Sequence, residues 1–152
     1  MAGAAGRSRD EVAAYLALAQ VPGIGAARLG TLVAAFESAA AALRAPHGAI
    51  AALPGFSRAA ATAIRAGSPR AGHEILHELD RLGACVLLPD DPAFPPLLSE
   101  VPDPPALLFA WGDPALLARP AAGIVAAATT RPTARKPRAS SPRVWPARAW
   151  WS

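Results

Sequence analysis

Two Pro-Gly pairs, each placed between apolar stretches of helical periodicity, constrain the fold of this chain most. Residues 21–25 read VPGIG and residues 53–57 read LPGFS, and each runs into an alanine-rich stretch. Proline fixes φ for the first central position of a turn, and glycine supplies the positive φ of the second. The first seventy residues are therefore expected to contain two helix-turn-helix hairpins.

Apolar periodicity and capping residues predict the helices around these turns. Ser8 and Glu11 have the spacing of a capping box, which predicts a first helix that ends near Gln20. After the first turn, apolar residues recur with the spacing of an amphipathic helix at Leu29, Leu32, Val33 and Phe36. Shorter helices are expected over residues 38–43, 49–53 and 59–66.

The pattern changes near residue 70, from helices alone to helix and strand. Residues 72–82 predict one more helix, and residues 84–88 and 106–110 predict two short strands. Residues 122–125 have the composition of the start of a third strand. A helix followed by successive strands is the opening of an α/β sheet, and no crossover helices follow it here.

Residues 126–152 show neither helical nor strand periodicity. Prolines recur there every four or five residues, which excludes a helix and disfavours a strand. The segment is therefore expected to be disordered. It carries six basic residues and no acidic one, and removing these six charges from the net charge of +4 leaves −2 for residues 1–125. The part expected to fold is slightly acidic, so the overall charge does not indicate a basic binding face.

Composition and residue spacing exclude several other classes of protein. The chain has one cysteine, Cys85, so an internal disulfide is excluded and a reduced, cytoplasmic location is expected. We find no apolar run long enough for a membrane span and no signal peptide. His73 and His77 are not predicted to bind metal, because no cysteine or third histidine lies near them. With no cofactor, general acid or general base assigned, we expect a binding protein and not an enzyme.

The first turn is the stronger candidate binding site. Gly23, Ile24 and Gly25 precede a helix whose first amides can donate to a phosphate and meet it with the positive end of the helix dipole. Arg28, one turn into the helix, would add a charge contact. The alternative is structural: the turn only links two packed helices, and Ile24 fills the core between them. Both interpretations stay open.

The second turn offers Gly55 and Arg58 as the corresponding contacts for a DNA backbone. Phe56 and Ser57 stand where the first turn has Ile-Gly, which removes the bare backbone next to the helix. This difference favours the structural interpretation for the second turn.

The order of these features resembles the DprA (Smf) family of DNA-processing proteins. The resemblance covers about residues 12–125 and includes both hairpins. Its most specific part is the run DPAFPPLL at residues 91–98, followed by DPPALLF at 103–109 and GIV at 123–125. The family has Tyr-Pro where this chain has Phe-Pro.

The resemblance implies a fold and a function. Family members have a helical domain like a sterile alpha motif (SAM), followed by an extended Rossmann domain. They bind single-stranded DNA in natural transformation and help to load a RecA-type recombinase onto it. We therefore expect an α+β chain with a SAM-like, helix-hairpin-helix domain at residues 8–70, an incomplete Rossmann-like segment at 71–125 and a disordered basic tail at 126–152. The alternative is a stand-alone helix-hairpin-helix module that binds DNA or protein.

The chain departs from the family pattern after residue 125. In the family, the matching strand runs into a Gly-Ser-Arg loop that helps to form an anion pocket, whereas residues 126–130 here read AAATT. Repeated GTG valine codons read as Trp-Trp in a shifted frame, and Trp150 and Trp151 stand near the expected position of the next valine-rich strand. We interpret the residues from about 126 onward as a frameshifted reading of the Rossmann domain, so that recombinase loading is not expected. A genuine basic tail is the alternative.

Overall fold

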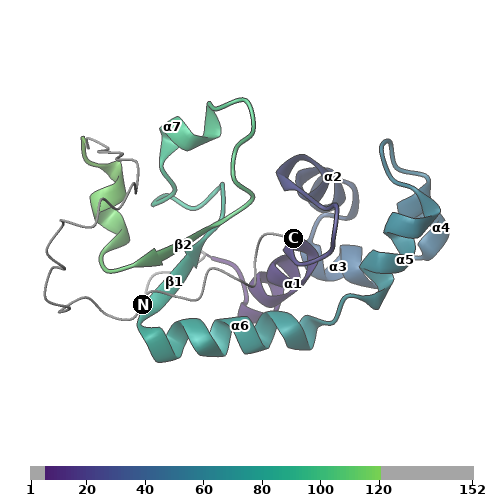
Figure 1. Ribbon diagram of the computed structural model, residues 1–152, viewed down its shortest axis with the longest axis horizontal. Helices are drawn as coiled ribbons and strands as arrows, with labels where there is room; N and C mark the ends of the chain where they lie inside the picture. The colour runs from purple at the N-terminus through teal and green to yellow at the C-terminus, as the bar shows by residue number, and fades with distance from the viewer. Residues whose placement is uncertain (1–5, 121–152) are drawn as a thin grey trace, which may run out of the picture. The chain divides into compact units, whose positions relative to one another are not determined.

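A computed structural model describes residues 6–120, which form helices and a small sheet (Figure 1). The helical part consists of α1 (Arg9–Ala19), α2 (Ala26–Phe36), α3 (Ala39–Arg44), α4 (His47–Ala51), α5 (Arg58–Ala66) and α6 (Pro69–Leu82). The elements that follow are β1 (Ala84–Leu87), α7 (Pro96–Ser99), β2 (Leu108–Trp111) and the 3-10 helix η1 (Pro114–Ala118). This mixture confirms the α+β class expected from the sequence.

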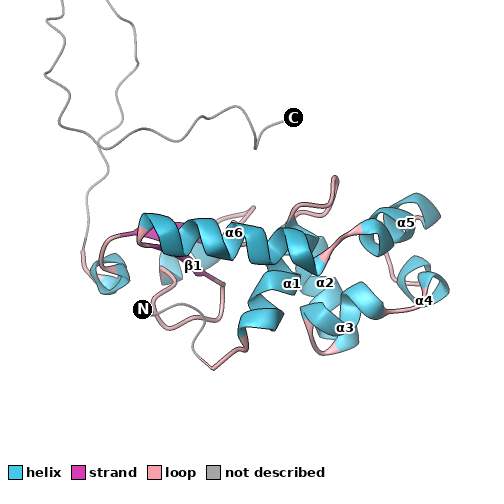
Figure 2. Cartoon of the chain, turned by 90° about the horizontal axis from the view of Figure 1, so that it is seen from below, coloured by secondary structure: helices cyan, strands magenta, loops and turns pink. Residues whose placement is uncertain are grey.

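Helix α1 is the centre of the helical part. Every residue from Val12 to Leu18 is buried, and α6, α3 and α2 all contact this helix (Figure 2). At the crossing of α1 and α6, a Cβ atom on Gly72 would lie 1.8 Å from the carbonyl oxygen of Ala13. Glycine at position 72 is therefore what allows the two helix backbones to touch.

Serine side chains begin several of these helices. Ser8 Oγ accepts from the Glu11 amide at 3.1 Å, and Ser38 Oγ accepts from the Ala41 amide at 3.0 Å. These bonds satisfy amides that have no acceptor within their own helix, which is why the helices begin there. The predicted first helix is confirmed, and the short helix expected over residues 38–43 is present at Ala39–Arg44.

The predicted capping box at α1 is formed only in part. The carboxylate of Glu11 accepts from the amides of Ala39 and Ala40, at 2.5 and 3.0 Å, instead of turning back to its own helix. Glu11 therefore caps the start of α3 and fixes that helix against α1, with its negative charge at the positive end of the α3 dipole.

Two helix boundaries differ from the sequence prediction. Helix α4 begins at His47, next to Pro46, so Gly48 lies inside the helix, although residues 49–53 were expected to form it. Helix α6 begins at Pro69 because Ser68 caps it, and proline suits the first turn of a helix. The predicted division between residues 70 and 71 thus falls in the first turn of α6. That division into two domains stays a prediction.

Strands β1 and β2 pair antiparallel, with Ala84 opposite Trp111 and Leu87 opposite Leu108. The two strands expected over residues 84–88 and 106–110 are present, the second displaced by one to two residues. An antiparallel pair does not identify a Rossmann sheet, whose repeating unit has parallel strands. The Rossmann-like assignment of residues 71–125 therefore stays a prediction. The expected strand at 122–125 and the expected disordered tail at 126–152 lie outside the described residues.

One apolar core connects the helices with the sheet. Its largest fully buried side chains come from α1, α2, α4, α5 and the β1 region: Leu16, Leu18, Leu29, Leu32, Ile50, Ile64, Leu87 and Leu88. The same core anchors both Pro-Gly turns, because Ile24 and Phe56 are buried in it, with 6% and 8% of their surface exposed. The core therefore fixes where each turn meets the surface. Within residues 6–120, we find no helix with the length and apolar character that a membrane span needs.

Candidate nucleic-acid interface

The two Pro-Gly turns have nearly the same backbone geometry. In each, the amide of the fourth residue donates to the carbonyl of the first, at 3.0 Å for Ile24 and 3.1 Å for Phe56. The central glycines have positive φ values, 79° for Gly23 and 81° for Gly55. These are the features of a type II turn with proline and glycine at its centre. Both tight turns predicted from the sequence are confirmed.

Each turn combines an exposed tip with a buried residue behind it. Pro22, Gly23 and Gly25 are exposed, whereas Ile24 between them is buried. Ile24 therefore fills the core behind the turn, as the structural interpretation expects. The same arrangement leaves the backbone of Gly23 and Gly25 accessible to a ligand.

The helices that follow the turns begin differently. Helix α2 has Gly25 at its N-cap, and no side chain caps it. Helix α5 has Ser57 there, whose Oγ accepts from the Ala60 amide at 3.1 Å. The first amides of a helix have no acceptor within the helix and carry partial positive charge. The start of α2 therefore offers more donors to an external acceptor than the start of α5.

Arg28 lies across the first turn and over the second. Its Nη1 donates to the carbonyl oxygen of Gly23 at 2.8 Å, and its Cζ lies 6.0 Å from the centre of the Phe56 ring. These two contacts join residues of both turns, and the phosphate contact predicted for the exposed Arg28 stays a prediction. Sequence reasoning missed this link because Arg28 and Phe56 lie far apart in the chain and no local pattern pairs them.

Arg58, the other arginine expected at a turn, is exposed as the first residue of α5. Its carbonyl accepts from Thr62 Oγ1 at 3.0 Å, while its guanidinium makes no hydrogen bond or ion pair within residues 6–120. Nearby, Arg65 Nη1 donates to the carbonyl of Arg44 at 3.2 Å, at the end of α3. Arg58 is thus the predicted site residue whose charge is available to a ligand.

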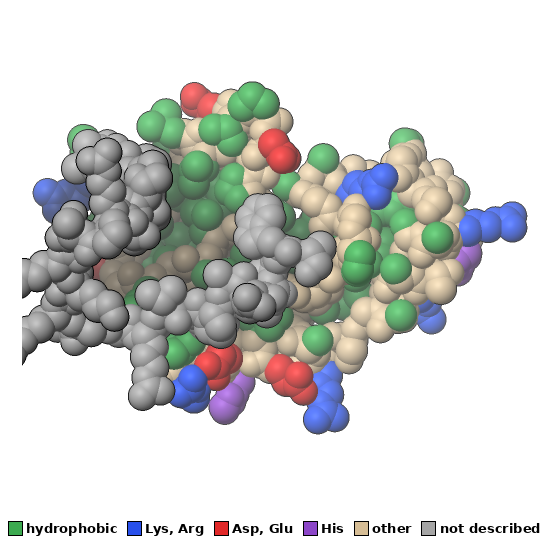
Figure 3. Space-filling view, in the orientation of Figure 1, with side chains coloured by type: hydrophobic (Ala, Val, Ile, Leu, Met, Phe, Trp, Pro, Cys, Tyr) green, Lys and Arg blue, Asp and Glu red, His purple; other side chains and the backbone are tan. Residues whose placement is uncertain are grey.

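Two of the remaining arginines are paired with acidic side chains on α6. Ion pairs join Arg70 to Glu74 at 3.1 Å and Arg81 to Glu78 at 2.5 Å on the surface of α6. The hydrogen bond from Arg81 lowers the pKa of Glu78 below its usual value. On the face shown in Figure 3, basic side chains are spread singly and do not gather over one element. Any anion contact at the turns therefore depends on local geometry more than on net charge.

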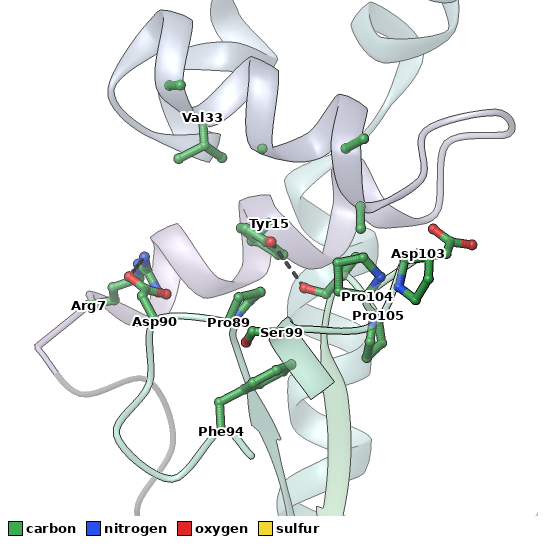
Figure 4. A pocket seen from close by; sticks show the side chains of 16 residues that line it. Arg7, Tyr15, Val33, Pro89, Asp90, Phe94, Ser99, Asp103, Pro104 and Pro105 are labelled. Atoms are coloured by element: carbon green, nitrogen blue, oxygen red, sulfur yellow. Dashed lines mark hydrogen bonds and ion pairs between the residues drawn. The ribbon is translucent and has the colours of Figure 1, made fainter. Parts of the chain in front are cut away.

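A groove of about 590 Å³ lies between α2 and the proline-rich loop before β2 (Figure 4). Tyr15 donates to the carbonyl of Ala106 at 3.1 Å, which fixes the loop to α1, and burial raises the pKa of Tyr15. At one end, Arg7 Nη1 donates to Asp90 Oδ1 at 2.6 Å, and this bond holds the pKa of Asp90 below its usual value. Sequence reasoning missed the groove, because three separate segments form it.

Histidine, cysteine and buried aspartate are the other residue types that could carry chemistry here. His73 Nε2 lies 3.2 Å from Asp10 Oδ1, joining α6 to α1. Burial raises the pKa of Cys85, which disfavours its thiolate. Asp91 is buried, and its Oδ2 accepts from the Leu88 amide at 2.6 Å. The part of the chain that the structure describes contains no group of three His, Cys, Asp or Glu residues that could hold a metal ion.

Comparison with known proteins does not assign the chain to a family. No family model matches it, and no curated protein or solved structure matches it either. The resemblance to the DprA family therefore depends on the motif residues of the sequence alone and is carried forward as a proposal.

Proposed function

We propose that this chain binds the backbone of single-stranded DNA through its first Pro-Gly turn and the start of α2, as a truncated DprA-like DNA-processing protein. The observation that carries the proposal is the uncapped start of α2 directly behind an exposed turn. A helix start with unsatisfied amides and an approachable backbone is suited to a phosphate group. The proposal involves binding alone and no chemical reaction.

The affinity expected from this site is modest. Residues 1–125 carry a net charge of −2, so long-range attraction to DNA is weak. Each phosphate neutralised on a single strand contributes about −0.7 to the slope of log K against log salt. Contacts at the two turns alone would therefore give a shallow salt dependence.

The sharpest test places a cap on α2. Gly25 has φ −85° and ψ −177°, and a Cβ there would meet nothing within 4 Å, so Gly25→Ser is tolerated. The new hydroxyl would accept from the amides proposed to bind phosphate. We expect the dissociation constant for a fluorescent thymidine oligonucleotide to rise about twofold, because displacing the new cap costs a few tenths of a kcal/mol.

The matched control is Gly30→Ser, also on the exposed side of α2 and with open space around it. This variant should bind the oligonucleotide as the wild-type chain does. If both variants bind like the wild type while remaining folded, the start of α2 does not contact DNA. Indifference of the wild-type chain to DNA would favour the alternative, a protein-binding module.

The basic segment at residues 126–152 needs its own control, because six positive charges can bind DNA without a specific site. Removing this segment should lower the salt slope by about 4, whereas the effect of Gly25→Ser should remain. An effect of Gly25→Ser that disappears with the segment would contradict the proposed site.

We also propose that this form does not load a recombinase, since the Gly-Ser-Arg loop expected from the family is replaced at residues 126–130. A strand-exchange assay with a RecA-type protein should show no stimulation. The frameshift interpretation is tested by the coding DNA downstream of codon 125. If no alternative frame there encodes a Gly-Ser-Arg-like loop, that interpretation fails.

A further inference from the structure

We infer that Arg28 is a positioning residue that joins the two Pro-Gly turns into one DNA-contacting surface. The inference rests on the proposed function and assigns to Arg28 a role different from the phosphate contact that the sequence predicts. It is carried by the two contacts of the guanidinium, one to the carbonyl of Gly23 and one to the ring of Phe56.

The guanidinium is held by the first turn. Nη1 donates to Gly23 at 2.8 Å, and a Cβ on Gly23 would lie 3.6 Å from the same nitrogen. The side chain thus lies closely along the turn, and its direction is set by the carbonyl that the positive φ of Gly23 presents. One N–H of the Arg28 guanidinium therefore donates to the protein and not to a ligand.

The central carbon of the guanidinium lies over the ring of Phe56 in the second turn. Phe56 is buried behind the exposed Gly55, and its ring centre is 6.0 Å from Arg28 Cζ. The broad guanidinium fork can donate to a carbonyl while it lies over an aromatic ring, and the compact lysine ammonium does not reproduce this geometry. Arg28 therefore connects the backbone of one turn with the core residue of the other.

This link brings complementary groups together. The uncapped start of α2 supplies amide donors, and the second turn supplies the available guanidinium of Arg58, two residues after Phe56. The core places both turns, and the link adds a restraint between their exposed tips. With that restraint, a DNA backbone that meets both contacts loses less conformational entropy on binding.

A double-mutant cycle on the full chain tests the inference with a thymidine oligonucleotide as the probe. We expect Arg28→Met and Phe56→Leu each to weaken binding by about three- to fivefold, as loss of an exposed cation–π contact would. The double variant should be no weaker than the weaker single variant, because either change breaks the same link. If the double variant weakens binding by the product of the two single effects, the inference is overturned.

The variant Arg28→Lys separates positioning from charge and leaves the buried core untouched. It keeps the positive charge but loses the guanidinium fork that donates to Gly23 while its Cζ lies over the Phe56 ring, so it should bind as weakly as Arg28→Met. If Arg28→Lys binds with wild-type affinity, charge alone matters and the inference is overturned. This test remains valid even if Phe56→Leu does not fold.

Amide hydrogen exchange gives a readout without DNA. Arg28→Met should speed exchange in both turns, at Ile24 and at Phe56, whereas Arg44→Met, at an exposed arginine on α3, should change neither. Faster exchange in the first turn alone would overturn the link. If the link is present but the wild-type chain does not bind the oligonucleotide, the proposed function fails and the DNA-contacting role fails with it.

Discussion

The two Pro-Gly turns share a backbone but differ in the residue that starts the next helix. Both are type II turns with a buried apolar residue behind the glycine, and their glycine φ values agree within a few degrees. The first is followed by Gly25 and an uncapped helix, the second by Ser57 and a capped one. The same turn geometry therefore serves packing in both places, while the first turn leaves more helix-start amides for a ligand.

A third glycine, Gly72, is expected to show the largest loss of unfolding free energy on replacement. It is needed for the space between two helices and not for its backbone conformation. Gly72→Ala would force a methyl group into the α1 backbone. We expect a loss of about 3 kcal/mol in the free energy of unfolding, as in strongly overpacked sites. Urea denaturation followed by circular dichroism measures it. A loss smaller than those of the turn glycines would contradict the close crossing of α1 and α6.

The equivalence of the turns is tested by replacing the central glycines. Gly23→Ala and Gly55→Ala each place a Cβ at positive φ, with a cost of about 1–2 kcal/mol. We expect equal losses of unfolding free energy within measurement error, since neither new Cβ meets a close neighbour. Clearly unequal losses would mean that the two turns are not equivalent in stability.

The difference between the helix starts is tested at the caps. Ser57→Ala should cost about 1 kcal/mol of unfolding free energy, because the Ala60 amide loses its acceptor. Gly25→Ser should change stability only by a few tenths of a kcal/mol, in the stabilising direction. Thermal or urea unfolding of the two variants measures both effects. If Gly25→Ser raised the free energy of unfolding by as much as Ser57→Ala lowers it, the expected order of the two effects would be wrong.

The smallest expected effect is a change in the salt dependence of DNA binding, which distinguishes a charge contact by Arg58 from the positioning role of Arg28. Arg58→Gln should reduce the slope of log K against log salt for the thymidine oligonucleotide by about 0.7, the value for one phosphate on a single strand. Arg28→Lys should weaken binding while keeping its charge near the turn. A salt titration by fluorescence anisotropy checks the slope. An unchanged slope for Arg58→Gln would remove Arg58 from the interface.

The amino-acid sequence by itself determined the local structure of this protein. Pro-Gly pairs specify the turns because proline and glycine restrict or extend φ locally, and serines such as Ser8 and Ser38 specify helix starts because their bonds span three residues. The β1 strand and the helix before it follow from apolar periodicity and from Gly83, which adopts a positive φ at the end of α6.

The partners of the long side chains depend on how the elements pack together. Glu11 caps α3 instead of its own helix, and Arg28 donates to the Gly23 carbonyl while its Cζ lies over the Phe56 ring. The groove beside Tyr15 likewise needs α1, α2 and a distant loop to come together. A flexible charged side chain has many partners within reach, and packing of the core selects among them. For that reason the sequence located the turns, while the fold determined which of their groups remain available to bind.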